Sequence, residues 1–464
     1  MLETLTRLMI RGRSVAVVPF ALLGACDVVP DANARVPLVS GRTGVQASSD
    51  VLALLPDGPE KRKFLMDCTG CHQFDAERAF PNGIPRSEAD WRDVVARMLP
   101  MGGTGGESPL ISPDRDPGST ARWLAEHFYA PPESAESPAP EVPPGAEITP
   151  FLFPFPEDLA HDVAVDAAGG VIVTGMFTHQ MLRLDPADGS WERFAIPVPG
   201  ANPRAVEIDA DGDWWVLLGG PGKLARYRVA DGDWDTWDIG MYGHSVRLDE
   251  AGRVWFNGHF TRHPTIIGWL DTATGVVSTA EIPNEPAPEA DHPMPYGLRV
   301  APDGRVWGTE LRGGRLFSYD PDTGATSVHP MPEPHSGPRR PAVDADGRLW
   351  IPEFAGNRLT RFDPATGEFR SFEFPRSSVL PYVTEVDRRT GLVWIGTAAA
   401  DLVYSFDPAS EGFTAYPMPT SDALIRHLVV DEERGEVWAA YGAYPGIAPR
   451  IVRIRPAGAT GARH

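Results

Sequence analysis

The amino-acid sequence predicts an all-β, seven-bladed β-propeller preceded by a small all-α domain. Three observations support this prediction. A unit of about 40 residues recurs seven times in the C-terminal two-thirds of the chain. One C-x-x-C-H motif near the N-terminus holds two of the three cysteines. Gly (47) and Pro (48) each make up about a tenth of the 464 residues, which is typical of short strands joined by tight turns.

The net charge bears on which kinds of molecule can be the main binding partner. The formal net charge is -21 and the pI is about 5.0. Nucleic acids and anionic lipid surfaces need a basic protein face, so the composition excludes both as the main partner.

The N-terminus predicts export. Arg7, Arg11 and Arg13 precede the apolar run 14–25, which is too short to span a bilayer and has the form of a secretory signal. The run ends in LGAC, which resembles the lipobox of bacterial lipoproteins. This resemblance implies a signal peptide over 1–25, a lipid on Cys26, and anchoring on the periplasmic side of a bacterial cell envelope, the only contact with a membrane. The alternative is a plain cleaved signal. Residues 26–49 are expected to form a flexible tether.

The segment FLMDCTGCHQF (64–74) contains the C-x-x-C-H motif. Two residues between the thiols let Cys68 and Cys71 reach both vinyl groups of one porphyrin edge, while His72 binds the iron. A zinc site would need a second C-x-x-C, and a redox dithiol normally opens a helix after a strand. Here the motif follows a short helix that begins near 57–58. The sequence therefore favours one covalent haem c over zinc or a dithiol.

A sixth iron ligand is expected after an amphipathic helix over 88–99. The segment DWRDVVARMLPMGG and the later helix STARWLAEHFYAP resemble small cytochrome c domains with a W-x-x-x-V-x-R-M pattern. The resemblance implies a cytochrome c-like domain over 50–130 with Met98 as the axial ligand, whose thioether raises the haem potential. Met101 is the alternative, with Met98 then packed in the core.

A Pro-rich linker (131–147) precedes the repeats, which occupy 148–458. Each repeat reads roughly V-x-D-x-x-G-x-V-W and then L-x-R-F-D-P-x-T-G. The glycines are spaced by 43, 40, 52, 43, 44 and 44 residues, the period of four-stranded propeller blades. Three residues after each glycine stand Ile172, Trp215, Trp255, Trp307, Trp350, Trp394 and Trp438.

Closure of the ring is also predicted. The seventh repeat stops at IVRIRP and lacks an outer strand, whereas ITPFLFPFP (148–156) has the pattern of one before the first repeat. We expect this N-terminal strand to complete the last blade and to remove the open edge.

The repeat, clearest as WIPEFAGNRLTRFDPATG from Trp350, resembles the virginiamycin B lyase (streptogramin lyase) family over about 150–456. The resemblance implies a seven-bladed propeller. It also implies magnesium binding and acid-base work by glutamate and histidine, for which Glu310 and Glu353 stand at the W-x-x-E position. One fold hosts many functions, so the activity does not follow from the fold.

The start of each innermost strand should line the mouth of the central channel. Counting back to that position gives one polar residue from each blade: His161, Arg204, His244, Tyr296, Arg339, Tyr382 and Arg426. The three arginines predict a small anionic ligand, held together with Tyr296 and Tyr382. His161 and His244 are the expected acid-base groups because histidine titrates near neutrality. His259 and His263 are further candidates nearby.

Tyr296 also bears on the choice of activity. In gluconolactonase-like propellers the corresponding position carries a metal-binding asparagine, so Tyr296 disfavours a calcium lactonase. A divalent metal in the propeller remains an open second cofactor. The alternative is a solvated, polar channel mouth that has no catalytic or binding function.

Two functions follow. The first is an exported, lipid-anchored c-type cytochrome that exchanges single electrons with a periplasmic donor or acceptor, as a haem-dependent oxidoreductase subunit whose propeller binds the anion or a redox partner. The alternative is a C-O lyase or lactonase with an ancillary haem domain. A third view makes the propeller a docking platform. No flavin or nicotinamide fingerprint is present.

Overall fold

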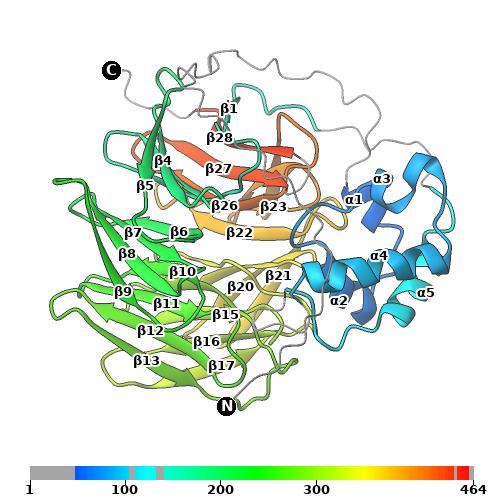
Figure 1. The fold of residues 1–464 in the computed structure, drawn as a ribbon, viewed down its shortest axis with the longest axis horizontal. Coiled ribbons are helices and arrows are strands. Elements are labelled where there is room, and N and C mark those ends of the chain that lie inside the picture. Colours follow the sequence, from blue (N-terminus) through cyan, green and yellow to red (C-terminus); the bar gives the residue numbers. More distant parts are fainter. Residues whose placement is uncertain (1–47, 104–109, 132–139, 444–446, 459–464) are drawn as a thin grey trace, which may run out of the picture.

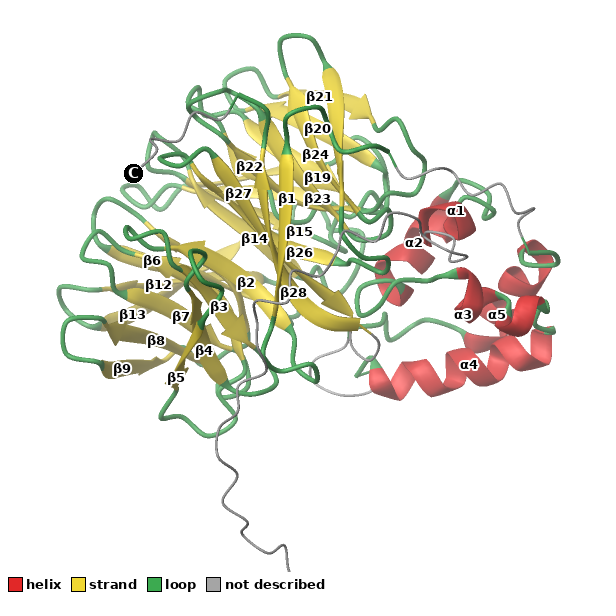
Figure 2. Cartoon of the chain, turned by 90° about the horizontal axis from the view of Figure 1, so that it is seen from above, coloured by secondary structure: helices red, strands yellow, loops and turns green. Residues whose placement is uncertain are grey.

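The structure is a computed structural model that describes residues 48–103, 110–131, 140–443 and 447–458. The predicted signal peptide and Cys26 lie outside these residues. A ring of seven four-stranded antiparallel sheets forms the larger part of the molecule, and a group of short helices lies on one side of it (Figures 1 and 2). The predicted seven-bladed propeller is confirmed.

The blades follow one another along the chain, each with its innermost strand first. Blades 1 to 3 comprise β2 (Ala160–Val165), β3 (Val171–Gly175), β4 (Gln180–Leu184), β5 (Trp191–Ala195); β6 (Pro203–Ile208), β7 (Trp214–Leu218), β8 (Lys223–Arg228), β9 (Asp233–Asp238); and β10 (Gly243–Leu248), β11 (Arg253–Gly258), β12 (Thr265–Asp271), β13 (Val276–Ile282). Blades 4 to 6 comprise β14 (Pro295–Val300), β15 (Val306–Glu310), β16 (Arg315–Tyr319), β17 (Thr326–Pro330); β18 (Ala342–Val343), β19 (Leu349–Glu353), β20 (Arg358–Asp363), β21 (Glu368–Glu373); and β22 (Pro381–Val386), β23 (Val393–Thr397), β24 (Leu402–Asp407), β25 (Gly412–Pro417).

The seventh blade closes the ring with strands from both ends of the propeller. It contains β26 (Ile425–Asp431), β27 (Glu436–Ala443) and β28 (Ile447–Arg455), and its outer strand is β1 (Glu147–Leu152). β1 pairs antiparallel with β28 from Glu147 opposite Arg455 to Leu152 opposite Arg450. The predicted closure is therefore confirmed, and every blade has four strands.

The repeated tryptophans form the core between blades. Each stands on the second strand of its blade and is at most 2% exposed, as is Ile172 in the first blade. In three blades the aspartate of the D-x-x-G turn fixes the indole ring of the tryptophan. It accepts a hydrogen bond from the indole nitrogen, as Asp249 does from Trp255 at 2.8 Å. The repeat therefore encodes both the turn and the position of its core side chain.

The helical domain comprises α1 (Ser48–Leu52), α2 (Pro59–Cys68), α3 (Ala76–Ala79), the 3₁₀ turn η1 (Pro81–Gly83), α4 (Glu88–Met101) and α5 (Pro117–His127). Ser87 and Asp90 form a capping box that begins α4 at the predicted residue. The helix runs two residues beyond the predicted 99. α1 starts inside the predicted tether, because the amide of Ser49 donates to the carbonyl of Ala399 in the propeller at 2.9 Å. No helix among the described residues has the length and apolar character needed to cross a bilayer.

Aromatic side chains build the core of this domain. Phe74 stacks on Trp91 and Phe128 with ring centroids 5.9 and 5.6 Å apart, and Phe64 meets Phe74 edge to face at 5.5 Å. The same hydrophobic cluster continues into blades 4 to 7 of the propeller. The helical domain is therefore packed against the propeller rather than tethered beside it.

Candidate functional site

The seven predicted mouth residues lie where the sequence places them, one in each blade. Six are the second residue of an innermost strand, and Arg339 lies three residues before β18. In those six blades the register between the first and second strands shifts at this residue, as between Ala160 and Val163 around His161. A β-bulge leaves the extra residue unpaired and re-aims its side chain. The bulges therefore free these side chains from the sheets.

The mouth is almost closed to solvent. Six of the seven residues are at most 4% exposed, and Arg204 in blade 2 is half-buried. The loop with the C-x-x-C-H motif contributes to this cover. Arg426 donates from Nη2 to the carbonyl of Cys71 at 2.8 Å and from Nη1 to that of Gly442 at 2.6 Å. A β-carbon on Gly70 would lie 3.5 Å from Nη2 of Arg339. Arg204 is therefore the most exposed of the seven side chains.

Arg339 is surrounded by aromatic rings. Its guanidinium carbon lies 3.7 Å from the ring centroid of Phe354, 4.1 Å from that of Tyr382 and 4.9 Å from that of Tyr296. It donates to the hydroxyl of Tyr296 at 2.9 Å, and that hydroxyl is hydrogen-bonded to the hydroxyl of Tyr382. Burial opposes ionisation of Tyr382, but the guanidinium groups of Arg339 and Arg426 lower its pKa. The mouth is thus electrically positive.

No carboxylate among the described residues neutralises this charge. Arg204, Arg339 and Arg426 form no ion pair with any residue that the structure describes, whereas the buried Arg315 and Arg340 pair with Glu310 and Asp162. Uncompensated buried charge is costly, so the three guanidinium groups create a site suited to an anion.

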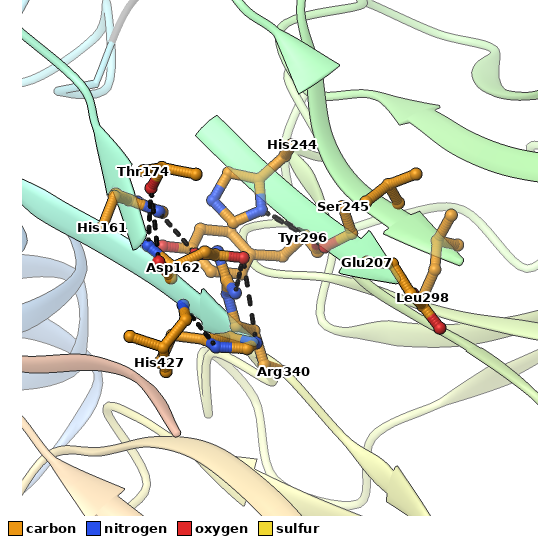
Figure 3. A network of polar contacts seen from close by, with 12 residues as sticks. His161, Asp162, Thr174, Glu207, His244, Ser245, Tyr296, Leu298, Arg340 and His427 are labelled. Carbon is orange, nitrogen blue, oxygen red and sulfur yellow. Dashed lines mark hydrogen bonds and ion pairs between the residues drawn. The ribbon is translucent and has the colours of Figure 1, made fainter. Parts of the chain in front are cut away.

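A polar network lies directly below the mouth (Figure 3). Asp162 accepts hydrogen bonds from His161 at 2.7 Å and from Arg340 at 2.9 Å, and Nε2 of His427 is 3.8 Å from its carboxylate. Burial, reinforced at His161 by Arg204, lowers the pKa of His161 and of His427 to about 3. Burial and neighbouring cations also hold the pKa of His244 well below its usual value. The expectation that His161 and His244 titrate near neutrality is wrong, because desolvation disfavours the imidazolium ion.

Asp162, Arg340 and His427 were not predicted as site residues. Each directly follows a mouth residue in the sequence, so the signal was present. Alternation along a strand assigns consecutive residues to opposite faces, but at Asp162 and His427 the bulge at the mouth position brings both residues toward the channel. The sequence carries no mark of the bulge itself.

The two predicted glutamates serve as buried hydrogen-bond and ion-pair partners, Glu310 for side chains of blades 3 and 4 and Glu353 for side chains of blade 5. Glu310 is fully buried and accepts from Arg315 at 2.6 and 2.7 Å and from Thr265 at 2.8 Å. Glu353 is 1% exposed and contacts Arg358 and Thr360. Their catalytic role stays a prediction. No group of three or more His, Cys, Asp or Glu arranged to hold a metal ion occurs among the described residues. The divalent metal in the propeller stays a prediction.

The predicted haem residues stand together at the end of α2. Cys68 is half-buried, Cys71 is exposed, and both are free thiols. Nδ1 of His72 is 2.8 Å from the carbonyl of Gln73. Met98 is half-buried near the end of α4, while Met101 is 70% exposed.

A buried ion triad fastens this helix to the propeller. The carboxylate of Asp67 lies 2.8 Å from Nε of Arg115 in the helical domain and 3.1 Å from Nη2 of Arg312 in blade 4. All three side chains are at most 6% exposed. Asp67 therefore neutralises two guanidinium groups at once, directly beside Cys68.

Asp67→Asn is expected to destabilise the protein by about 3–5 kcal/mol, because removing one partner of a buried ion pair leaves the others unpaired. Urea unfolding followed by circular dichroism measures the change. The matched control is Asp93→Asn on the exposed face of α4, which should shift stability by less than about 0.5 kcal/mol. Equal stability of the two variants would contradict the role assigned to Asp67.

These features define a class of protein: a seven-bladed β-propeller with a cationic mouth covered by a helical domain that carries a C-x-x-C-H loop. The sequence profile of the virginiamycin B lyase family matches residues 280–461, which cover blades 4 to 7. The propeller is therefore virginiamycin B lyase-like. No curated protein matches the chain in sequence.

Solved structures agree on the fold. A catalytically inactive virginiamycin B lyase from Staphylococcus aureus with quinupristin is 18% identical, with a TM-score of 0.59, 67% of this chain covered and 99% of that one. A streptogramin B lyase is 19% identical with the same TM-score, 68% and 99% covered. YCF48 bound to a D1 peptide is 14% identical, with a TM-score of 0.52, 69% and 99% covered. At these identities the likeness establishes the fold alone.

Proposed function

We propose that the protein is an exported c-type cytochrome with one covalent haem on Cys68, Cys71 and His72, which exchanges single electrons beside a propeller mouth that binds a small anion. One observation supports the proposal most directly. The C-x-x-C-H loop rests on the cationic mouth, where the backbone carbonyl of Cys71 accepts a hydrogen bond from Arg426 at 2.8 Å. A ligand held there would lie against the loop that would hold the haem.

The motif has the chemistry that a haem needs. The carbonyl of Gln73 only accepts hydrogen bonds, so Nδ1 of His72 carries the proton and Nε2 keeps its lone pair for iron. Burial lowers the pKa of His72 and favours the neutral imidazole that a metal ligand must be. Met98, or Met101 in its place, would be the sixth ligand. The haem would supply the single-electron exchange that the chain's own side chains lack.

The location and partners follow from the same proposal. Attachment of c-type haem takes place outside the cytoplasm, in agreement with the signal-like N-terminus and Cys26 as the lipid anchor. The mouth is covered by the helical domain, so a protein partner would exchange electrons at the outer face of that domain. A periplasmic electron donor or acceptor fits this arrangement.

Arg426→Gln tests the coupling between the two parts. Removing a positive charge beside the haem loop should lower the midpoint potential, since the reduced haem carries one positive charge less than the oxidised haem. A charge interaction of about 1 kcal/mol corresponds to a shift on the order of 50 mV. Spectroelectrochemical titration of the full-length protein, purified from a host that attaches c-type haem, measures it.

Arg370→Gln is the matched control, because Arg370 lies on the outer strand β21 and is about half exposed. It should leave the potential unchanged within a few millivolts. A c-type spectrum with the same potential in both variants would contradict the proposed coupling between the haem loop and the mouth. The lack of a c-type spectrum would contradict the haem itself.

A second candidate is a lyase or lactonase that works without the haem. The profile match and the two lyase structures favour it for the propeller, since no comparison concerns the helical domain. The neutral His161 or His244 would then act as the base that takes up a proton. This candidate predicts ring opening of a cyclic depsipeptide or lactone by haem-free protein, followed by mass spectrometry, and loss of turnover in His244→Phe. Turnover that depends on haem reduction would exclude it.

A further inference from the structure

Two stacked histidines at the mouth present unprotonated nitrogens. His244 on β10 and His259 just after β11 have ring centroids 4.4 Å apart and an interplanar angle of 29°. Nδ1 of His244 is 3.0 Å from the carbonyl of Tyr296, and Nδ1 of His259 is 2.9 Å from that of Pro295. Carbonyl oxygens only accept hydrogen bonds, so each Nδ1 carries a proton.

Both rings are neutral. Burial, with contributions from Arg204 and other cations, lowers the pKa of His244 and of His259 well below the usual value. In a neutral imidazole with a proton on Nδ1, Nε2 is a pure acceptor. Both Nε2 atoms are buried, and neither has a hydrogen-bond partner among the described residues. A buried acceptor without a donor is costly, so the site is complementary to a group that donates.

The histidine acceptors and the cationic groups both lie close to the side chain of Tyr296. The ring of Tyr296 lies 4.0 Å from the ring of His244 and 4.9 Å from the guanidinium of Arg339. His161 approaches the same centre from blade 1, with its ring 6.0 Å from that of His244 (Figure 3). These separations are those of opposite ends of one small organic molecule.

We infer that the mouth binds a hydroxyl-bearing organic anion, whose carboxylate pairs with Arg339 and the neighbouring arginines and whose hydroxyl donates to Nε2 of His244 or His259. This inference rests on the anion site of the proposed function and names its ligand class, but it needs no haem. A simple carboxylate leaves the two acceptors unsatisfied. An ammonium donor or a metal cation is repelled by the three guanidinium groups.

Matched pairs of carboxylates test the inference by isothermal titration calorimetry on the full-length protein at pH 7. The pairs are glycolate and acetate, lactate and propionate, and 4-hydroxybenzoate and benzoate. In at least one pair the hydroxyl member should bind at least about tenfold more tightly, because a site built to accept a hydrogen bond discriminates against an analogue without the donor. Equal binding of both members in every pair, or binding of none, overturns the inference.

Three variants locate the effect. His259→Phe and His244→Phe keep an aromatic ring but remove the acceptor, so each should reduce the hydroxyl preference while binding of the plain carboxylate persists. Arg339→Gln should weaken both members of a pair alike. His329→Phe on the outer strand β17 is the matched control and should change neither; a preference that survives in both mouth histidine variants overturns the inference. The haem spectrum of the same samples reports the proposed cytochrome separately, so the two can fail independently.

Discussion

Replacing Cys68 and Cys71 together with alanine is expected to abolish covalent attachment of haem. The two thiols are the only attachment points in the motif, and the third cysteine lies far outside it at position 26. His72 would remain, but a single axial imidazole holds haem only reversibly. The alkaline pyridine spectrum and the intact mass of the purified protein measure the effect. The wild type should carry one porphyrin and the double variant none.

Thr69→Ser is the matched control for this change. Thr69 lies between the two cysteines, and its hydroxyl donates to the carbonyl of Leu65 at 2.6 Å, which serine can reproduce. It should retain full haem content. Single replacement of either cysteine should leave one thioether and a shifted absorption maximum. A wild-type protein without porphyrin mass, from a host that attaches it to a known cytochrome c, would remove the electron-transfer proposal and leave the propeller functions standing.

The sequence predicts the propeller well because each blade is specified by residues that lie close together in the sequence. The aspartate, the glycine and the tryptophan of each repeat act within one hairpin, as Asp249 and Trp255 do. The same local register places the mouth residues, since each stands eight or nine residues before its repeat glycine. Even the closing strand is predictable, because the missing outer strand of blade 7 leaves an edge that only 148–156 fits.

The contact between the helical domain and the mouth is not predictable from the sequence. It depends on pairs that are hundreds of residues apart, such as Cys71 with Arg426 and Asp67 with Arg312. Each pair joins the helical domain to a propeller blade, so no single repeat or motif contains both of its members. The Pro-rich linker separates the helices from the repeats in the sequence, whereas the structure unites them through one hydrophobic cluster. The protonation state of the mouth also depends on this packing, because burial overrides the intrinsic pKa of histidine.

Acidification is expected to destabilise the propeller through these buried histidines. In the folded protein the pKa of His161 and of His427 is about 3, and an unfolded histidine titrates near 6.5. Between these values the unfolded state binds more protons than the folded state, so stability falls as the pH drops below about 6.5. At pH 5.5 each histidine lowers the free energy of unfolding by about 1.4 kcal/mol relative to high pH. The two together contribute about 3 kcal/mol.

Urea unfolding at pH 7.5 and pH 5.5, followed by tryptophan fluorescence, measures this loss. His427→Asn isolates one contribution. Asparagine still offers an acceptor to the amide of Val163, which donates to Nδ1 of His427 at 3.3 Å. The variant should lose about 1.4 kcal/mol less than the wild type over the same pH interval. His179→Asn is the control, because His179 is exposed and its Nδ1 accepts from the amide of Asn202. An equal acid sensitivity of wild type and His427→Asn would show that His427 is not held neutral, and the electrostatic description of the channel would then have to change.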